Sequence, residues 1–428
     1  MNFFRSCFLF FLFLALLSCR KEIDEVPPQI TWLFPTDNTT FSTLDEIFVE
    51  AEIQDNESIK SIQLGLFRKS DNRQVQGNND FSPNSNQFRL ALNFLIKDSL
   101  IESGTYYFRI LADDGENVKA AFRDIQINTV PKVRLNTIVS CESGNGVQFF
   151  KDNNDFNFSA FLTDPNSLTE AVVNSIDQQY WMLSKRGGYI SVFDLKENSI
   201  AYQNQLLSNF SELFTSVDLE DRTVLIAAKD GEIRGFNESF QDNFTYRAIN
   251  SGRSILNLKA NHKYLLAEEV DLNGSNRSVQ ILFRNNGFIH TELAISDPVK
   301  AIYFTSQEMA ILFQNNANGG LLSEVDIQAN GVRTMKTFRD SIISVTQISD
   351  KDYFISTSNK IVRYDFSTNT SFDFLIIPNA VIAYDELNNQ LLIGSNQTLS
   401  VYSLNPTNLV TQATLPSRII NIDVRFNR

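Results

Sequence analysis

Two patterns of apolar residues run along the chain. Near the start, Phe8 to Leu17 is an unbroken apolar run of ten residues, too short to cross a bilayer as a helix, which needs about 20 residues. Beyond residue 28, apolar and polar residues alternate in short stretches, separated by clusters of Asn, Asp, Ser and Gly. Such spacing is typical of short antiparallel strands, and helical periodicity is nearly absent. The pattern predicts an all-β protein behind an N-terminal segment of another kind.

Residues 1–18 have the features of a bacterial export signal. Arg5 supplies a positive charge, and the apolar run ends in the letters LLSC at Cys19. This ending resembles the lipobox of bacterial lipoproteins, and the resemblance implies cleavage before Cys19 and lipid attachment to Cys19. The alternative is an ordinary secretory signal with an incidental cysteine. Residues 19–28, which end in two prolines, are predicted to form an extended tether.

Cysteine content limits how the protein is stabilised. The chain has three cysteines, Cys7, Cys19 and Cys141. Cys7 leaves with the signal and Cys19 carries the lipid, so the mature chain has no pair for an intrachain disulfide. Its stability must therefore come from the core, which is sufficient because large domains bury roughly three quarters of their chain surface.

Residues 29–130 are predicted to form an immunoglobulin-like β-sandwich. Alternating stretches lie at 47–53, 61–67, 88–94, 104–112 and 121–127. About seven strands in about 100 residues is the count of such domains. The stretch from Leu100 to Tyr106 resembles the tyrosine corner of fibronectin type III and related bacterial domains. The resemblance implies a fold and no function.

Residues 131–428 contain an internal repeat. One strand recurs with an aromatic or aliphatic residue before a polar one near its end; the copies are 189–195, 232–238, 321–327, 360–366 and 398–404, with a weaker copy at 279–285. From Phe193 to Tyr402 the repeat covers five periods of about 42 residues each. A four-stranded propeller blade has roughly 40–45 residues. The repeat therefore predicts a β-propeller.

The repeat also places the inner strands of this propeller. Their expected starts are Leu168, Phe214, Ile255, Val299, Ile342 and Ala380, with a seventh inner strand at 418–425. The last one has no following strands, so strands from about 132–165 would complete its sheet and close the ring. Seven inner strands in 298 residues predict seven blades, with six or eight as alternatives. The pattern resembles the quinoprotein-dehydrogenase-like and WD40-like propeller superfamily, although Gly-His and Trp-Asp pairs are missing.

The charge of the chain excludes one class of partner. The formal net charge is −13, and removal of Arg5 with the signal leaves −14. Such acidity argues against nucleic acid and against docking on anionic lipid.

Few residues suggest chemistry in the propeller. Asp194, Asp326 and Asp365 each begin a D-x-x-x-N sequence, and we expect them to cap turns. The two histidines are His262, in a predicted turn, and His290, in a predicted strand. Neither has metal-site spacing, and no G-x-S-x-G elbow accompanies them. We predict no catalytic residue, no metal site and no cofactor.

Two groups of acidic residues are interpreted separately. The turn containing Asp113, Asp114 and Glu116 suits a plain hairpin and also suits calcium, and the sequence leaves both open. Glu268 and Glu269 lie in a predicted strand, where neighbouring side chains point to opposite faces. They are therefore not expected to form a close catalytic pair.

These features predict a lipid-anchored, non-catalytic binding or scaffolding protein of the bacterial outer membrane, facing the periplasm or the medium. Arg20 follows Cys19, whereas Asp at that position retains lipoproteins at the inner membrane in some Gram-negative bacteria. The sandwich would be a spacer, and the propeller would bind a protein or a glycan, with a protein favoured. The closest functional analogy is the propeller lipoprotein of the barrel-assembly machinery, and it is an analogy of architecture only. The alternative is a lyase or hydrolase that uses the central funnel. The oligomeric state stays open.

Overall fold

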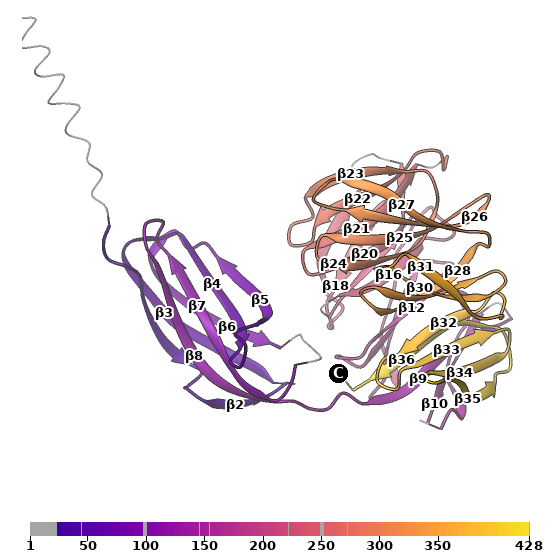
Figure 1. The fold of residues 1–428 in the computed structure, drawn as a ribbon, viewed down its shortest axis with the longest axis horizontal. Helices are drawn as coiled ribbons and strands as arrows, with labels where there is room; N and C mark the ends of the chain where they lie inside the picture. The colour runs from indigo at the N-terminus through magenta and orange to yellow at the C-terminus, as the bar shows by residue number, and fades with distance from the viewer. Residues whose placement is uncertain are drawn as a thin grey trace, which may run out of the picture. The chain divides into compact units, whose positions relative to one another are not determined.

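The computed structural model describes residues 24–43, 45–96, 101–144, 146–153, 155–220, 222–248, 252–271 and 273–427. The chain divides into two compact units, Met1–Pro131 and Lys132–Arg428, and the described parts of both consist of strands and loops (Figure 1). The predicted all-β class is confirmed. Within these described ranges, no helix is long and apolar enough to span a membrane. The predicted signal and Cys19 lie outside the described residues.

The first unit contains two β-sheets. One consists of β1 (Gln29–Phe34), β3 (Glu46–Ile59) and β6 (Ser85–Leu95), in that order. The other has the order β2 (Thr39–Ser42), β8 (Val118–Asn128), β7 (Gly104–Asp113), β4 (Ser61–Arg68) and β5 (Gln74–Phe81). Neighbouring strands are antiparallel except β2 and β8, which are parallel. Strand β5 was not expected, because this edge strand carries Gln, Asn and Asp instead of alternating apolar residues.

The two sheets share one apolar core. The residues of β3 predicted to share a face are fully buried: Ile47, Val49, Ala51 and Ile53. The matching residues of β7 are buried too: Tyr106, Phe108, Ile110 and Ala112. Both sets belong to one cluster of packed side chains, so the first unit is a β-sandwich.

The described residues of the second unit form seven four-stranded sheets. The first three consecutive sheets are β12 (Leu168–Asn174), β13 (Gln179–Ser184), β14 (Tyr189–Asp194), β15 (Ser199–Gln205); β16 (Phe214–Glu220), β17 (Thr223–Ala228), β18 (Glu232–Phe236), β19 (Asp242–Arg247); and β20 (Arg253–Ala260), β21 (Tyr264–Asp271), β22 (Arg277–Phe283), β23 (Ile289–Ile295). The next three are β24 (Val299–Ser306), β25 (Met309–Asn316), β26 (Gly319–Asp326), β27 (Gly331–Phe338); β28 (Ile342–Ser349), β29 (Asp352–Thr357), β30 (Ile361–Asp365), β31 (Thr370–Leu375); and β32 (Val381–Asp385), β33 (Gln390–Ser395), β34 (Thr398–Leu404), β35 (Thr407–Thr414).

The remaining sheet joins the two ends of the unit. It has the order β11 (Phe158–Asp164), β10 (Gly146–Asp152), β9 (Arg134–Ser143) and β36 (Ile419–Phe426). Strand β36 pairs antiparallel with β9, and Figure 1 shows the two side by side. The inner strands β12, β16, β20, β24, β28, β32 and β36 contact one another in that order, and β36 contacts β12. The sheets thus surround a common axis, which is the arrangement of a β-propeller.

Burial follows the position of a strand within its sheet. All six residues of β13 are buried, because neighbouring sheets cover both faces of this second strand. All seven residues of the outermost strand β15 are exposed. The predicted inner-strand starts fall within two residues of the observed ones, and β9 to β11 supply the three strands expected from 132–165.

The D-x-x-x-N sequences form turns, as predicted. Asp194 Oδ1 accepts hydrogen bonds from the main-chain N–H groups of Lys196 and Glu197, at 2.7 and 2.8 Å. Asp326 and Asp365 accept equivalent bonds in their own turns. The closing asparagines all have positive φ, at 53° for Asn198, 51° for Asn330 and 52° for Asn369. Asn tolerates this left-handed region better than other side chains do.

We expect Asn330→Val to lower the free energy of unfolding by about 1–2 kcal/mol, because a β-branched residue is strained at positive φ. Asn330→Gly should change it by only a few tenths of a kcal/mol, since glycine adopts this conformation freely. Urea unfolding of both variants measures the difference. A valine variant as stable as the glycine variant would show that the turn relaxes to another conformation.

Candidate functional site

Polar side chains on the inner strands connect neighbouring sheets of the propeller. Adjacent sheets are separate in the hydrogen-bond pattern of the described strands, so main-chain groups near the axis need other partners. Side chains supply them, each reaching the next inner strand of the ring. The bonds join Glu170 Oε2 to Val217 N (2.7 Å), Thr215 Oγ1 to Ile255 O (2.7 Å), Asp218 Oδ2 to Ala260 N (2.8 Å), Asn257 Nδ2 to Val299 O (2.9 Å), Tyr303 Oη to Val345 O (2.8 Å) and Ser344 Oγ to Ile382 N (3.4 Å).

A β-bulge near the start of most inner strands sets the direction of these side chains. The pairing register shifts near the start of six of the seven described inner strands, for example between Leu168 and Glu170 in β12 and between Phe214 and Ser216 in β16. A bulge inserts one residue and redirects the side chains that follow. These bonds join strands of different sheets, so the pattern of residues along one strand does not indicate them.

Two carboxyl groups on the inner strands, those of Glu170 and Asp423, have raised pKa values. Asp423 Oδ2, on β36, accepts hydrogen bonds from Tyr180 Oη at 3.0 Å and from Asn421 Nδ2 at 2.7 Å. Desolvation raises the pKa of Asp423 to about 7, the bond from Tyr180 opposes this, and the negative charge of Glu170 adds to it. Desolvation likewise raises the pKa of Glu170 to about 7, against the bond from Val217 N. In both groups, desolvation is the largest cause of the raised pKa.

Lys259 lies on the inner strand β20, beside Asp218 on the inner strand β16. Lys259 Nζ donates to Asp218 Oδ1 at 2.5 Å. Burial opposes the charge of Lys259, but the Asp218 carboxylate outweighs it and raises the pKa of this lysine. Near this pair, desolvation raises the pKa of Tyr303 to about 12. The inner strands therefore bring together the ion pair of Lys259 with Asp218 and two carboxyl groups whose pKa values are raised by burial.

The predicted separation of Glu268 and Glu269 is confirmed, but both residues are buried. Glu268 has no exposed surface; it pairs with Arg277 and accepts a bond from Val299 N at 3.0 Å. On the other face, Glu269 Oε1 accepts a bond from Tyr246 Oη at 3.0 Å. Desolvation raises the pKa of Glu269. Each glutamate is held by its own partners and they do not share a site.

The histidines and the propeller cysteine have structural surroundings. His262 is exposed in the turn before β21, and His290 lies in β23, as predicted. The ring of His290 packs against Tyr264 and Phe283. Cys141 is fully buried, and desolvation raises the pKa of its thiol to about 12. A thiol with such a pKa is a poor nucleophile.

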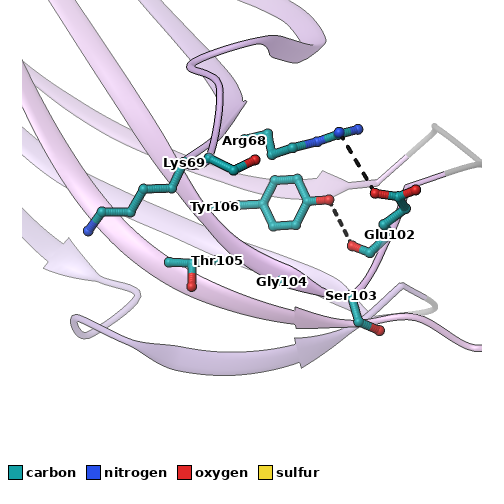
Figure 2. A pocket seen from close by; sticks show the side chains of 8 residues that line it. Arg68, Lys69, Glu102, Ser103, Gly104, Thr105 and Tyr106 are labelled. Carbon is teal, nitrogen blue, oxygen red and sulfur yellow. Dashed lines mark hydrogen bonds and ion pairs between the residues drawn. The ribbon is translucent and has the colours of Figure 1, made fainter.

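In the first unit, a shallow pocket surrounds Tyr106. Its hydroxyl donates to Glu102 O at 2.7 Å, four residues upstream. Figure 2 shows Arg68 directed at the carboxylate of the same glutamate, with the nearest ion-pair atoms 3.8 Å apart. This is the hydrogen bond of a tyrosine corner. The polar groups of this pocket thus hold the corner together.

The acidic turn belongs to a larger cluster than the sequence indicated. Asp114 offers a carboxylate oxygen that lies within 4.8 Å of one from Asp24 and one from Asp55. Burial opposes the ionisation of Asp114, but the N–H groups of Asn117 and Glu116 outweigh it and lower its pKa. Asp24 was assigned to the tether by the sequence. In the structure its main-chain N–H donates to Glu116 Oε2 at 2.6 Å, so it is bonded to the sandwich.

The comparisons with known proteins support the fold of the second unit. No family model and no curated protein matches the sequence. Among solved structures, the WD40 repeats of RRP9 match with 11% sequence identity and a TM-score of 0.50. The match covers 67% of this chain and 88% of that chain. The WD40 β-propeller domain of Doa1 matches with 13% identity, 62% and 88% coverage and a TM-score of 0.50. A Bacteroides fragilis protein described as a candidate 6-phosphogluconolactonase matches with 11% identity, 68% and 98% coverage and a TM-score of 0.52. The predicted β-propeller is confirmed.

Proposed function

We propose that this chain is a lipid-anchored extracytoplasmic binding protein, with a seven-bladed propeller that binds a partner and an immunoglobulin-like sandwich that acts as a spacer. One observation carries the proposal. The polar groups near the propeller axis are bonded to the main chain of the next inner strand, from Glu170 to Ser344. Groups used in this way stabilise the ring, which leaves the loops at its two faces as the binding surface.

The anchor in this proposal is the lipid on Cys19. Its support is the resemblance of the LLSC sequence to a lipobox at the end of an apolar run. Each buried CH₂ of an acyl chain contributes about 0.8 kcal/mol, and two or more chains hold a protein stably. Arg20 after Cys19 supports placement at the outer membrane, by resemblance to Gram-negative lipoproteins.

The spacer role follows from where the chain enters and leaves the sandwich. Asp24, at the entry, is bonded to Glu116 and Asn117 in the turn before β8. The chain leaves the unit after β8, which has 11 residues. At about 3.3 Å per residue, β8 spans about 35 Å. Entry and exit thus lie at opposite ends of the long strands, which suits a unit that holds two attached parts apart. The two-sheet core and the tyrosine corner support the immunoglobulin-like assignment.

A protein is the better partner than a glycan. Sugar-binding sites commonly present exposed aromatic rings, and the tryptophans here are unsuited to this role. Trp181 is fully buried, and the indole of Trp32 packs against Phe108 and Arg123. The acidic chain, with a net charge of −13, favours a partner with a basic surface.

Crosslinking of the native protein in its own membranes, followed by pull-down, tests the proposal. The control is Cys19→Ala, which removes the lipid attachment site. We expect one membrane protein at a fixed ratio to the wild-type chain and its loss in the control. Recovery of a glycan or a small molecule without any protein would contradict the scaffold role.

A second candidate function, a lyase or hydrolase, is favoured by one observation. Glu170 and Asp423 both have pKa values raised to about 7, which suits general acid–base catalysis near neutral pH. Hydrolysis or elimination on a polysaccharide library by the purified chain would support it. Glu170→Gln should then lower the rate by about 10²–10⁴-fold. Activity that survives this substitution would exclude the pair as catalyst.

A further inference from the structure

Three aspartates from separate segments converge at the entry end of the sandwich. Asp24 precedes β1, Asp55 lies in the irregular part of β3, and Asp114 lies in the turn between β7 and β8. One carboxylate oxygen of each lies within 4.8 Å of the other two. Oxygens bound to one calcium ion are each about 2.4 Å from it, so they lie at most about 4.8 Å apart. The spacing of the three carboxylates therefore fits one ion.

Each aspartate uses one oxygen in a local bond. Asp24 Oδ1 accepts from Val26 N at 3.0 Å, and Asp55 Oδ1 accepts from Glu57 N at 2.7 Å. Asp114 Oδ1 accepts from Glu116 N and Asn117 N, both at 2.6 Å. These bonds fix the orientation of all three carboxylates, so their second oxygens are held in place as well.

Two of the three second oxygens have no hydrogen-bond donor. Asp24 Oδ2 and Asp55 Oδ2 are both buried from solvent and accept no hydrogen bond. Asp114 is only 6% exposed, and its Oδ2 accepts one long bond of 3.3 Å from Asn117 Nδ2. A buried carboxylate oxygen without a donor is costly, and two beside a third carboxylate repel one another. A cation among them removes both penalties.

The surroundings of the cluster are acidic as well. Glu57 and Glu116 line the same pocket as Asp24 and Asp114, and Lys60 is the one basic residue among the lining residues that the structure describes. Five nearby carboxylates against one ammonium leave an excess of negative charge. Glu57 and Glu116, with main-chain oxygens and water, offer the additional hard oxygen ligands that a six- to eight-coordinate ion takes.

We infer that Asp24, Asp55 and Asp114 form a calcium site that fixes the incoming chain to the end of the sandwich. The ligands are all oxygens on three separate segments, which suits the flexible coordination of calcium better than the strict octahedron of magnesium. The ion would join the segment at Asp24 to β3 and to the turn between β7 and β8. The site does not depend on the lipid anchor, so the failure of either proposal leaves the other standing.

Calorimetric titration of the full chain in detergent, freed of metal with EDTA, tests the site. We expect one calcium ion per chain, with a dissociation constant of about 10⁻⁵–10⁻³ M. Asp55→Asn keeps the oxygen that accepts from Glu57 N and should weaken binding at least tenfold. The matched control is Asp71→Asn, because Asp71 Oδ1 makes the same kind of bond, to Arg73 N at 3.1 Å, in an exposed turn. Its affinity should equal that of the wild type.

Hydrogen exchange gives a second measurement of calcium binding that does not depend on the heat of binding. Calcium should slow exchange of the Val26 N–H in the wild type and leave it unchanged in Asp55→Asn, with circular dichroism confirming that the variant is folded. Absence of saturable binding up to about 10 mM calcium, ten times the weakest affinity of extracellular calcium modules, would overturn the site. Binding that is equal in Asp55→Asn and in the wild type, or a tighter response to magnesium, would overturn it too.

Discussion

Asp423→Asn is expected to stabilise the propeller at pH 8 by up to about 4 kcal/mol and to leave it nearly unchanged at pH 4. The pKa of Asp423 is raised from 3.8 to about 7, first by desolvation and also by the charge of Glu170. Three pH units at 1.36 kcal/mol each give about 4 kcal/mol.

The sign follows from proton binding. Between pH 4 and pH 7 the unfolded chain has lost the proton of Asp423, whereas the folded chain keeps it. Stability from this group is therefore complete below about pH 4 and falls as the pH rises to about 7. An asparagine carries no charge at any pH, so the variant should lose this part of the pH dependence.

Urea unfolding at several pH values measures the effect. Trp32→Phe in all chains leaves Trp181, which is buried in the propeller, as the fluorescent reporter of that unit. The control is Asp373→Asn, whose side chain is 62% exposed; its stability should differ little from the wild type at every pH. A variant Asp423→Asn with the same pH slope as the wild type would show that this carboxyl is ionised in the fold.

Arg277→Met should lower the free energy of unfolding by about 3–5 kcal/mol. Arg277 is 11% exposed and pairs with Glu268, which has no exposed surface. Removing the arginine leaves a buried carboxylate without its cation, and this loss is much larger than the net contribution of the intact pair. Urea unfolding followed through Trp181 measures it.

Two further variants separate this cause from a general effect of losing an arginine. Arg333 pairs with Glu324 on the surface and is 70% exposed, so Arg333→Met should cost at most about 1 kcal/mol. Adding Glu268→Gln to Arg277→Met removes the unpaired charge and should recover a large part of the stability. A double variant no more stable than Arg277→Met would assign the loss to packing of the arginine stem.

The strands of the propeller were predictable because the ring repeats one unit. The expected starts at Leu168, Phe214, Val299 and Ile342 coincide with the observed ones. Each of these starts follows a segment that contains Asn or Asp, residues that favour turns. Local rules of this kind need no knowledge of distant contacts.

Contacts between sheets were not predictable in the same way. Asp423 and Tyr180, which share a hydrogen bond, are 243 residues apart in the chain. The bulge near the start of the inner strands also shifts the alternation, so the sequence pattern does not say which polar residue faces which neighbour. The bonds from these polar side chains to the next inner strand could therefore not be predicted from the sequence.

The carboxylate cluster shows the same limit in the first unit. The acidic turn at 113–117 was visible in the sequence, and calcium was one of its two readings. Its partners Asp24 and Asp55 lie in two other segments, and only folding brings all three carboxylates together. Asp24 Oδ2 and Asp55 Oδ2 become buried only in the folded protein, so the sequence of a single segment does not predict their burial.

Strand β36 gives the folding of this protein a fixed order in time. It completes the sheet that β9, β10 and β11 begin, and it is the last strand of the ring in chain order, so it is the last to emerge where the chain folds. Until then the partner edge of β9 has open N–H and C=O groups, which attract strands of other chains. The sandwich, with all its strands before residue 131, can finish folding in the meantime. The time for which an unfinished ring is prone to aggregation is therefore set by how long β36 takes to reach the open edge of β9.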